Sequence, residues 1–71
     1  MPYVNVKVVK GVFDEEQKQE MLSRITETMV DIEGEALRPY TLVTLEELNS
    51  GDWCVGGQFI TTQAARTLRA S

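Results

Sequence analysis

The chain contains no histidine and a single cysteine among 71 residues. Without histidine it cannot build a Ser-His-Asp triad, a Cys-His pair or a histidine-bearing metal site, so we expect neither a metal nor a cofactor. Cys54 cannot form a disulfide within the chain, and we expect it to be reduced. With no base available to form a thiolate, we predict that it is a buried small apolar residue rather than a nucleophile.

Basic residues are also scarce, with seven Lys and Arg against eleven Asp and Glu and a net charge of −4. Nucleic acids and anionic membranes are bound by clustered Lys and Arg, so neither is an expected partner. No run is apolar and long enough to span a bilayer, and the opening Met-Pro-Tyr-Val-Asn lacks the basic and then apolar layout of a signal peptide. We therefore expect a cytoplasmic protein.

The length leaves room for one domain, residues 1–71. A chain this short buries a modest fraction of its surface and usually needs disulfides, a metal or partner subunits. The composition argues against the first two. We therefore predict that the chain is stabilised by partner subunits.

Hydrophobic periodicity predicts a strand followed by a long helix. Residues 2–9 alternate, with valines at every second position, which is typical of a half-buried strand. Asp14, with Gln17 three residues later, has the form of a capping box, and Gly34 is a suitable helix end. The expected apolar stripe of this helix comprises Met21, Leu22, Ile25, Met29 and Ile32. Outside it we expect Lys18, Glu20, Arg24 and Glu27.

A second strand is predicted at residues 40–46, after a short loop that carries Arg38 and Pro39. Two strands joined by a helix form a β-α-β unit in which the strands run parallel. The helix can cover only one face of this pair, so we expect another subunit on the other face. The remaining sequence predicts turns at 49–52 and 56–57, a short strand at 58–60 and a final helix at 61–70.

The amino terminus is the remaining candidate for catalysis. Proline at position 2 permits removal of Met1, which leaves a free secondary amine on Pro2. Such an amine can act as a general base when its pKa lies near the working pH, and an apolar pocket or a nearby positive charge would bring it there. The alternative is that Pro2 only opens an edge strand, where a missing N–H does no harm.

The combined pattern resembles the 4-oxalocrotonate tautomerase family over residues 2 to about 59. The resemblance is carried by the Met-Pro start, the alternating strand, Gly11, the helix opening Asp-Glu-Glu-Gln-Lys at 14–18 and the segment Gly-Asp-Trp-Cys-Val-Gly-Gly at 51–57. It implies an α+β fold, in which a β-α-β protomer with a carboxy-terminal β-hairpin oligomerises through its sheets. It also implies a hexamer built as a trimer of dimers.

The resemblance further implies an isomerase in which Pro2 moves a proton on a small 2-oxo or 2-hydroxydienoate acid. Trp53 matches the family's active-site aromatic, which closes the pocket wall, although it could equally anchor an interface. The arginines with which the family stabilises negative charge on the substrate fall on Val12 and Leu42. Arg38 is the substitute that we predict for binding the substrate carboxylate, and its alternative is a solvated loop charge.

Two other functions remain open. Because Val12 and Leu42 are apolar where the family keeps charge, the chain could be a subunit of a hetero-oligomeric enzyme, or a catalytically inactive binding or structural homologue. Without any appeal to the family, it reads as a small interaction module whose exposed sheet face serves assembly. We predict a homo-oligomer that acts on a small carboxylic acid, with the hetero-oligomer as its alternative.

Overall fold

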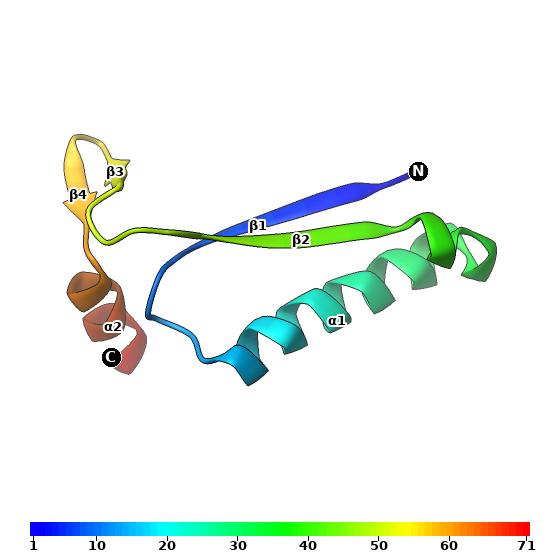
Figure 1. Cartoon of the computed structure of the whole chain (residues 1–71), viewed down its shortest axis with the longest axis horizontal. Coiled ribbons are helices and arrows are strands. Elements are labelled where there is room, and N and C mark those ends of the chain that lie inside the picture. Colours follow the sequence, from blue (N-terminus) through cyan, green and yellow to red (C-terminus); the bar gives the residue numbers. More distant parts are fainter.

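The fold is built on a parallel pair of strands connected by a long helix (Figure 1). The computed structural model describes the whole chain, residues 1–71. Its first three long elements are β1 (Tyr3–Val9), α1 (Glu15–Glu33) and β2 (Leu42–Leu48). The two strands pair in parallel along their full length, with Tyr3 opposite Leu42 and Val9 opposite Leu48. The predicted β-α-β unit is therefore confirmed.

The residues between α1 and β2 do not form the expected loop. Glu35–Tyr40 is a 3-10 helix, η1, and β2 begins at Leu42 rather than at residue 40. Backbone bonds from Leu37 N to the Gly34 carbonyl (3.1 Å) and from Thr41 N to the Arg38 carbonyl (3.2 Å) close its turns. Such tight turns need only i to i+3 bonds, which is why a short segment can be helical here.

The carboxy-terminal third carries the implied hairpin and the predicted final helix. β3 (Trp53–Val55) pairs antiparallel with β4 (Gln58–Ile60), and α2 (Thr62–Ala70) follows. Figure 1 places the hairpin and α2 together at the end of the molecule opposite the amino terminus. The pattern of the sequence did not predict a strand at 53–55, the three residues between the predicted turns at 49–52 and 56–57; only the implied hairpin called for one.

The boundaries of α1 match the sequence signals. Asp14 Oδ1 accepts a hydrogen bond from Gln17 N at 2.8 Å, and Gln17 Oε1 accepts one from Asp14 N at 3.0 Å, so the capping box is complete. Gly34 ends the helix with a φ of 103°, a conformation that favours glycine. Neither α1 nor any other helix combines the length and apolar character needed to cross a membrane.

The buried side of α1 differs from the expected stripe at both ends. Ile32, expected inside, is 79% exposed, whereas Val30 is only 3% exposed. Val30 and Glu33, which accepts a hydrogen bond from Thr41 Oγ1 at 2.6 Å, lie on the inner side of the last turn of α1. Ile32 follows Val30 by two residues, about 200° around the helix, and therefore faces away from it. Lys18, expected outside, has a side chain only 13% exposed, because Glu15 at 2.7 Å and Glu47 of β2 at 3.0 Å hold its ammonium at the sheet.

The ion pair between Lys18 and Glu47 makes stability depend on pH. Its hydrogen bond lowers the pKa of the Glu47 carboxyl from its usual 4.5. A carboxyl with a lowered pKa in the folded state stabilises the fold above its ordinary pKa, and this contribution is lost as the pH falls through the lowered value. We expect Glu47→Gln to lower the thermal midpoint at about pH 7 and this deficit to shrink towards zero near about pH 3. Glu46→Gln, which removes a carboxylate in no ion pair, is the control. A deficit that stays constant with pH would contradict the assignment.

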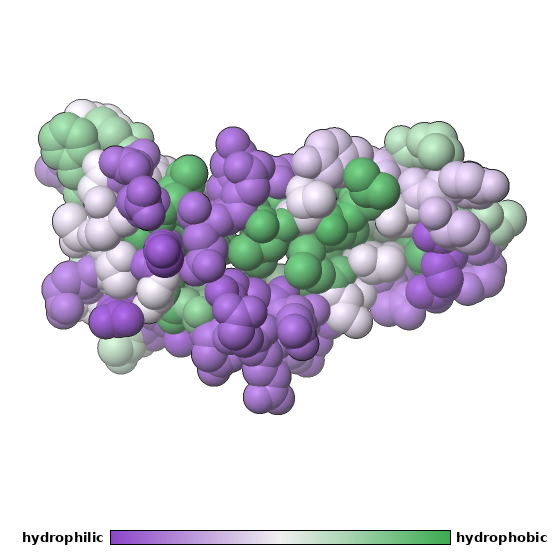
Figure 2. Space-filling model, viewed as in Figure 1, coloured by the Kyte–Doolittle hydropathy of each residue, from purple (hydrophilic) through white to green (hydrophobic).

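The chain by itself encloses very little. Only Val9 and Val30, at 8% and 3% exposure, are buried. The radius of gyration is 14.7 Å, against about 11 Å for a compact chain of this length. Figure 2 shows apolar residues uncovered along the middle of the molecule. A core this small cannot offset the entropy lost when the chain folds alone.

The face of the β1–β2 pair opposite α1 is open. Glu47 contacts α1, and because side chains alternate along a strand, Thr44 and Leu42 point the other way. On that open face the Tyr3 hydroxyl lies 3.0 Å from Thr44 Oγ1, and Asn5 Nδ2 donates to the same oxygen at 2.7 Å. Tyr3 and Leu42 nevertheless remain 62% and 55% exposed. Nothing within the chain covers this face.

α2 is fastened to the turn after β1 by two hydrogen bonds. Thr62 Oγ1 donates to the Lys10 carbonyl at 2.6 Å, and Arg66 Nε donates to the Gly11 carbonyl at 2.9 Å. Gly11 has a φ of +88°, and a Cβ at this position would lie 3.1 Å from Thr62 Cγ2. Glycine therefore allows both the turn and the close approach of α2.

Gly11→Ala should lower the free energy of unfolding by about 1–3 kcal/mol, because the new Cβ strains the backbone and crowds Thr62. Denaturant unfolding followed by circular dichroism measures the change. Gly57→Ala is the matched control, since Gly57 has a similar φ of +86° but nothing within 4 Å of the new atom. If both substitutions cost the same, the contact with Thr62 contributes nothing.

Candidate active site

Pro2 is held at the amino-terminal end of the sheet. It is half-buried, and its carbonyl accepts a hydrogen bond from Leu42 N at 3.1 Å. The backbone of Pro2 is thus fastened to the start of β2. Met1 is 85% exposed, so its removal would break no packing. While Met1 is attached the Pro2 nitrogen belongs to a peptide bond and cannot accept a proton.

Trp53 and Val12 lie at the other end of the molecule. Both line an apolar groove of about 670 Å³ between the end of β1, the hairpin and α2. All seven residues of β1 lie between Pro2 and Val12 along the chain, which corresponds to about 20 Å of strand. The structure brings Val12 and Trp53 together, but within one chain it brings neither of them to Pro2.

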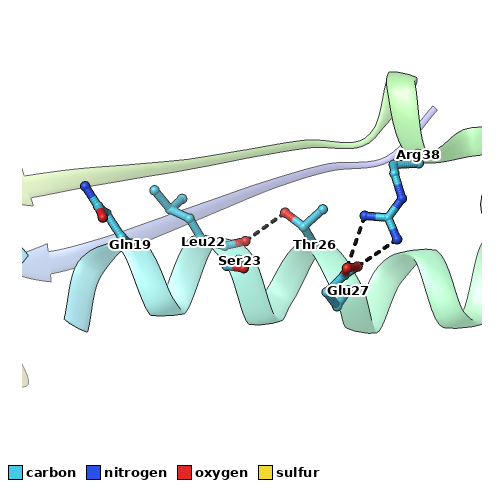
Figure 3. A pocket seen from close by; sticks show the side chains of 6 residues that line it. All are labelled: Gln19, Leu22, Ser23, Thr26, Glu27 and Arg38. Atoms are coloured by element: carbon cyan, nitrogen blue, oxygen red, sulfur yellow. Dashed lines mark hydrogen bonds and ion pairs between the residues drawn. The ribbon is translucent and has the colours of Figure 1, made fainter. Parts of the chain in front are cut away.

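Leu42 and Arg38 lie near the Pro2 end, and only Arg38 carries a charge. Its guanidinium turns towards Glu27 of α1 (Figure 3), where Nη2 lies 2.9 Å from Glu27 Oε2. Its Nε lies 2.5 Å from Oε1 of Glu35, which belongs to η1 itself. The hydrogen bonds with Glu35 and then Glu27 raise the pKa of Arg38, and the pKa of Glu35 is lowered in turn. Leu42 is 55% exposed and lies opposite Tyr3 in the sheet.

Arg38 borders a shallow hollow of about 370 Å³ over α1 that Pro2 does not line (Figure 3). Two carboxylates already satisfy its guanidinium, so a substrate carboxylate would have to displace at least one of them. The role of Arg38 in binding substrate stays a prediction. Within the chain, its ion pair with Glu27 fastens η1 to α1.

Two further arginines, not singled out from the sequence, lie beside Val12. Arg66 and Arg69 of α2 line a second hollow, of about 280 Å³, together with Val12 and Ala70. They are three residues apart, which places them on one side of the helix. That spacing was the only signal in the sequence, and it does not say what α2 packs against.

The remaining chemistry-bearing side chains do not form a site. No three Cys, Asp or Glu side chains gather closely enough to hold a metal ion. Cys54 is a free, exposed thiol rather than the buried residue expected. It lies in β3, one strand of a two-stranded hairpin that the rest of the protomer leaves largely uncovered.

The comparisons with known proteins all match tautomerases or their homologues. The sequence profile of a family described as tautomerase enzyme matches residues 2–63. Probable tautomerase K2 of Dickeya dadantii (strain 3937) is 31% identical over 61 residues, which cover 86% of this chain and 90% of that protein. The crystal structure of YwhB, a homologue of 4-oxalocrotonate tautomerase, matches with a TM-score of 0.71 at 29% identity, over 82% of this chain and 92% of its own. Apo unfused 4-OT matches with a TM-score of 0.73 at 25% identity, over 90% and 98%.

Proposed function

The chain belongs to the tautomerase family, and on that premise we propose that it is a cofactor-independent isomerase with Pro2 as its general base. Membership supports a tautomerase activity in general. The proposed substrate is a small 2-oxo or 2-hydroxydienoate acid. After Met1 is removed, the ring nitrogen takes a proton from one atom of the substrate and delivers it to another, either between the enol oxygen and carbon or between two carbon atoms. The reaction is therefore a keto-enol or 1,3-allylic proton shift.

The position of Pro2 is the observation that supports this most directly. Pro2 immediately precedes β1, and the Leu42 N–H at 3.1 Å fastens its carbonyl to the neighbouring strand. Its nitrogen is therefore presented from a rigid sheet end rather than from a loose tail. A proton acceptor in a fixed position is what general-base catalysis requires.

We further propose a homo-oligomer, a hexamer built as a trimer of dimers, in which each active site lies between chains. Two observations support this: a single chain buries only two residues, and the length of β1, about 20 Å of strand, lies between Pro2 and Val12 of the groove. A neighbouring chain in the opposite orientation could bring its own groove to Pro2. An apolar enclosure of this kind favours the neutral, proton-accepting amine.

The apolar Val12 and Leu42 favour a second candidate, in which a different subunit supplies the missing positive charge or the chain is catalytically inactive. The ion pairs of Arg38 add to this candidate, because they occupy the substitute arginine. Activity that appears only after co-expression with a paralogue would favour the shared site. Activity of the chain alone would exclude it.

The test starts with intact mass, to establish that Met1 is absent. Ketonisation of enolised phenylpyruvate and of 2-hydroxymuconate is then followed by ultraviolet absorbance. We expect the Met1-free protein to accelerate at least one of these reactions over buffer. Rates equal to those in buffer for both substrates would contradict the proposed activity of the homo-oligomer on 2-oxo and 2-hydroxydienoate acids.

A further inference from the structure

The four arginines of the chain divide into two pairs. Arg24 and Arg38 are each ion-paired with glutamates of α1 or η1. Arg66 and Arg69 take part in no ion pair, although the chain carries eleven acidic residues. Two neighbouring guanidinium groups without a carboxylate can together hold an anion.

Both guanidinium groups are positioned while their donors remain available. Arg66 uses only Nε, which donates to the Gly11 carbonyl at 2.9 Å, and its two terminal nitrogens make no hydrogen bond. The Arg69 guanidinium lies over the Phe13 ring, 4.9 Å from the ring centre, and donates no hydrogen bond. A cation held over an aromatic face keeps its edge free for a ligand. A site with held cations and free donors is partly preorganised for an anion.

The hollow between these arginines adjoins the apolar groove. Val12 and Arg69 line both the hollow and the groove, whereas Trp53 and Leu68 are among the residues that line only the groove. No acidic side chain lines either one. A ligand that fits both would carry a carboxylate at one end and an apolar body at the other. We propose that Arg66 and Arg69 bind the carboxylate of such an acid while its body lies in the groove.

This assignment deepens the proposed function and rests on it for the identity of the ligand as substrate. The hollow lies beside Val12, where the sequence lacks the charge that the resemblance implies, and α2 brings the charge to that place from another part of the chain. The family profile ends at residue 63, two residues into α2. Since the length of β1, about 20 Å of strand, lies between Pro2 and Val12 of the same chain, the arginines would serve Pro2 of a neighbouring chain.

Binding can be measured without turnover, because Trp53 is the only tryptophan and lines the groove. Its fluorescence is titrated with phenylacetate and with phenylacetamide, which share a shape and differ in charge. We expect phenylacetate to bind the wild type more tightly, and Arg66→Gln or Arg69→Gln to weaken it about tenfold without changing phenylacetamide binding. Arg24 and Glu20, an ion pair of α1, line a hollow next to Arg69, so the control replaces both, Glu20→Gln with Arg24→Gln, and should match the wild type.

A second variant leaves the hydrogen bonds of α2 in place. Val12→Glu puts a carboxylate into the hollow and should abolish phenylacetate binding, while circular dichroism and native mass stay those of the wild type. Phenylacetate affinities equal to the wild type in Val12→Glu, or in both arginine variants, would overturn the assignment. Pro2→Ala separates this site from the catalytic proposal, because it should bind phenylacetate normally. If Pro2→Ala keeps full activity while the arginine variants lose affinity, the result supports the anion site and contradicts the proposed role of Pro2.

Discussion

Pro2→Ala is expected to lower kcat for phenylpyruvate ketonisation by about 10²–10⁴-fold, the range that a positioned general base contributes. Alanine at position 2 also permits removal of Met1, so the variant still begins with an amine. That amine is primary, rotates about its bond to Cα and is more easily hydrated, whereas the proline ring fixes the direction of the lone pair. The kinetics are therefore compared only between preparations shown by intact mass to lack Met1.

Protein that keeps Met1 provides an independent check of the same claim. Its Pro2 nitrogen is an amide whose lone pair is delocalised, so a similar loss of activity is expected. Because Met1 is 85% exposed, the fold should be unaffected, and circular dichroism spectra of the two forms should coincide. Wild-type kcat in Pro2→Ala or in the Met1-bearing form would show that this nitrogen is not the proton acceptor.

The elements that the sequence predicts well are those set by short-range rules. The alternation in β1 and the capping box at Asp14 involve residues within a few positions of one another, and both are confirmed. The errors concern which side chains of α1 are buried, because the packing of the helix on the sheet determines this. Ile32 fits the spacing of the stripe but lies about 200° around the helix from the buried Val30. Lys18 turns inward because its ammonium donates to Glu47, 29 residues away.

The residues of the candidate site also differ in whether the sequence alone could identify them. Pro2 and Trp53 could be named because each stands in a recognisable local setting, the chain start and the segment at 51–57. Arg66 could not, because its position depends on a hydrogen bond to Gly11, which is 55 residues away. Periodicity predicts that α2 is a helix, but it does not predict which surface the helix meets. Only the three-dimensional structure therefore shows that the positive charges of Arg66 and Arg69 lie beside the apolar Val12.

Co-expression of Pro2→Ala with Val12→Glu is expected to restore activity that neither variant has alone. Pro2→Ala replaces the fixed proline nitrogen by a poorly placed primary amine. Val12→Glu places a like charge against the substrate carboxylate, which should lower kcat/KM by about 100-fold or more. In a randomly mixed homo-oligomer, each site takes Pro2 from one chain and the Val12 groove from another, so about one quarter of the sites have both parts intact. We therefore expect about one quarter of wild-type activity.

Native mass spectrometry establishes the mixing, and two differently tagged Pro2→Ala chains expressed together are the control, which should stay inactive. The expectation follows from the length of β1, which separates Pro2 from the Val12 groove within each chain. If Pro2 and Val12 of the same chain formed one site, every chain in the mixture would carry a defect in its own site. The mixture would then show only the low average of the two variants, and a site shared between chains would be excluded.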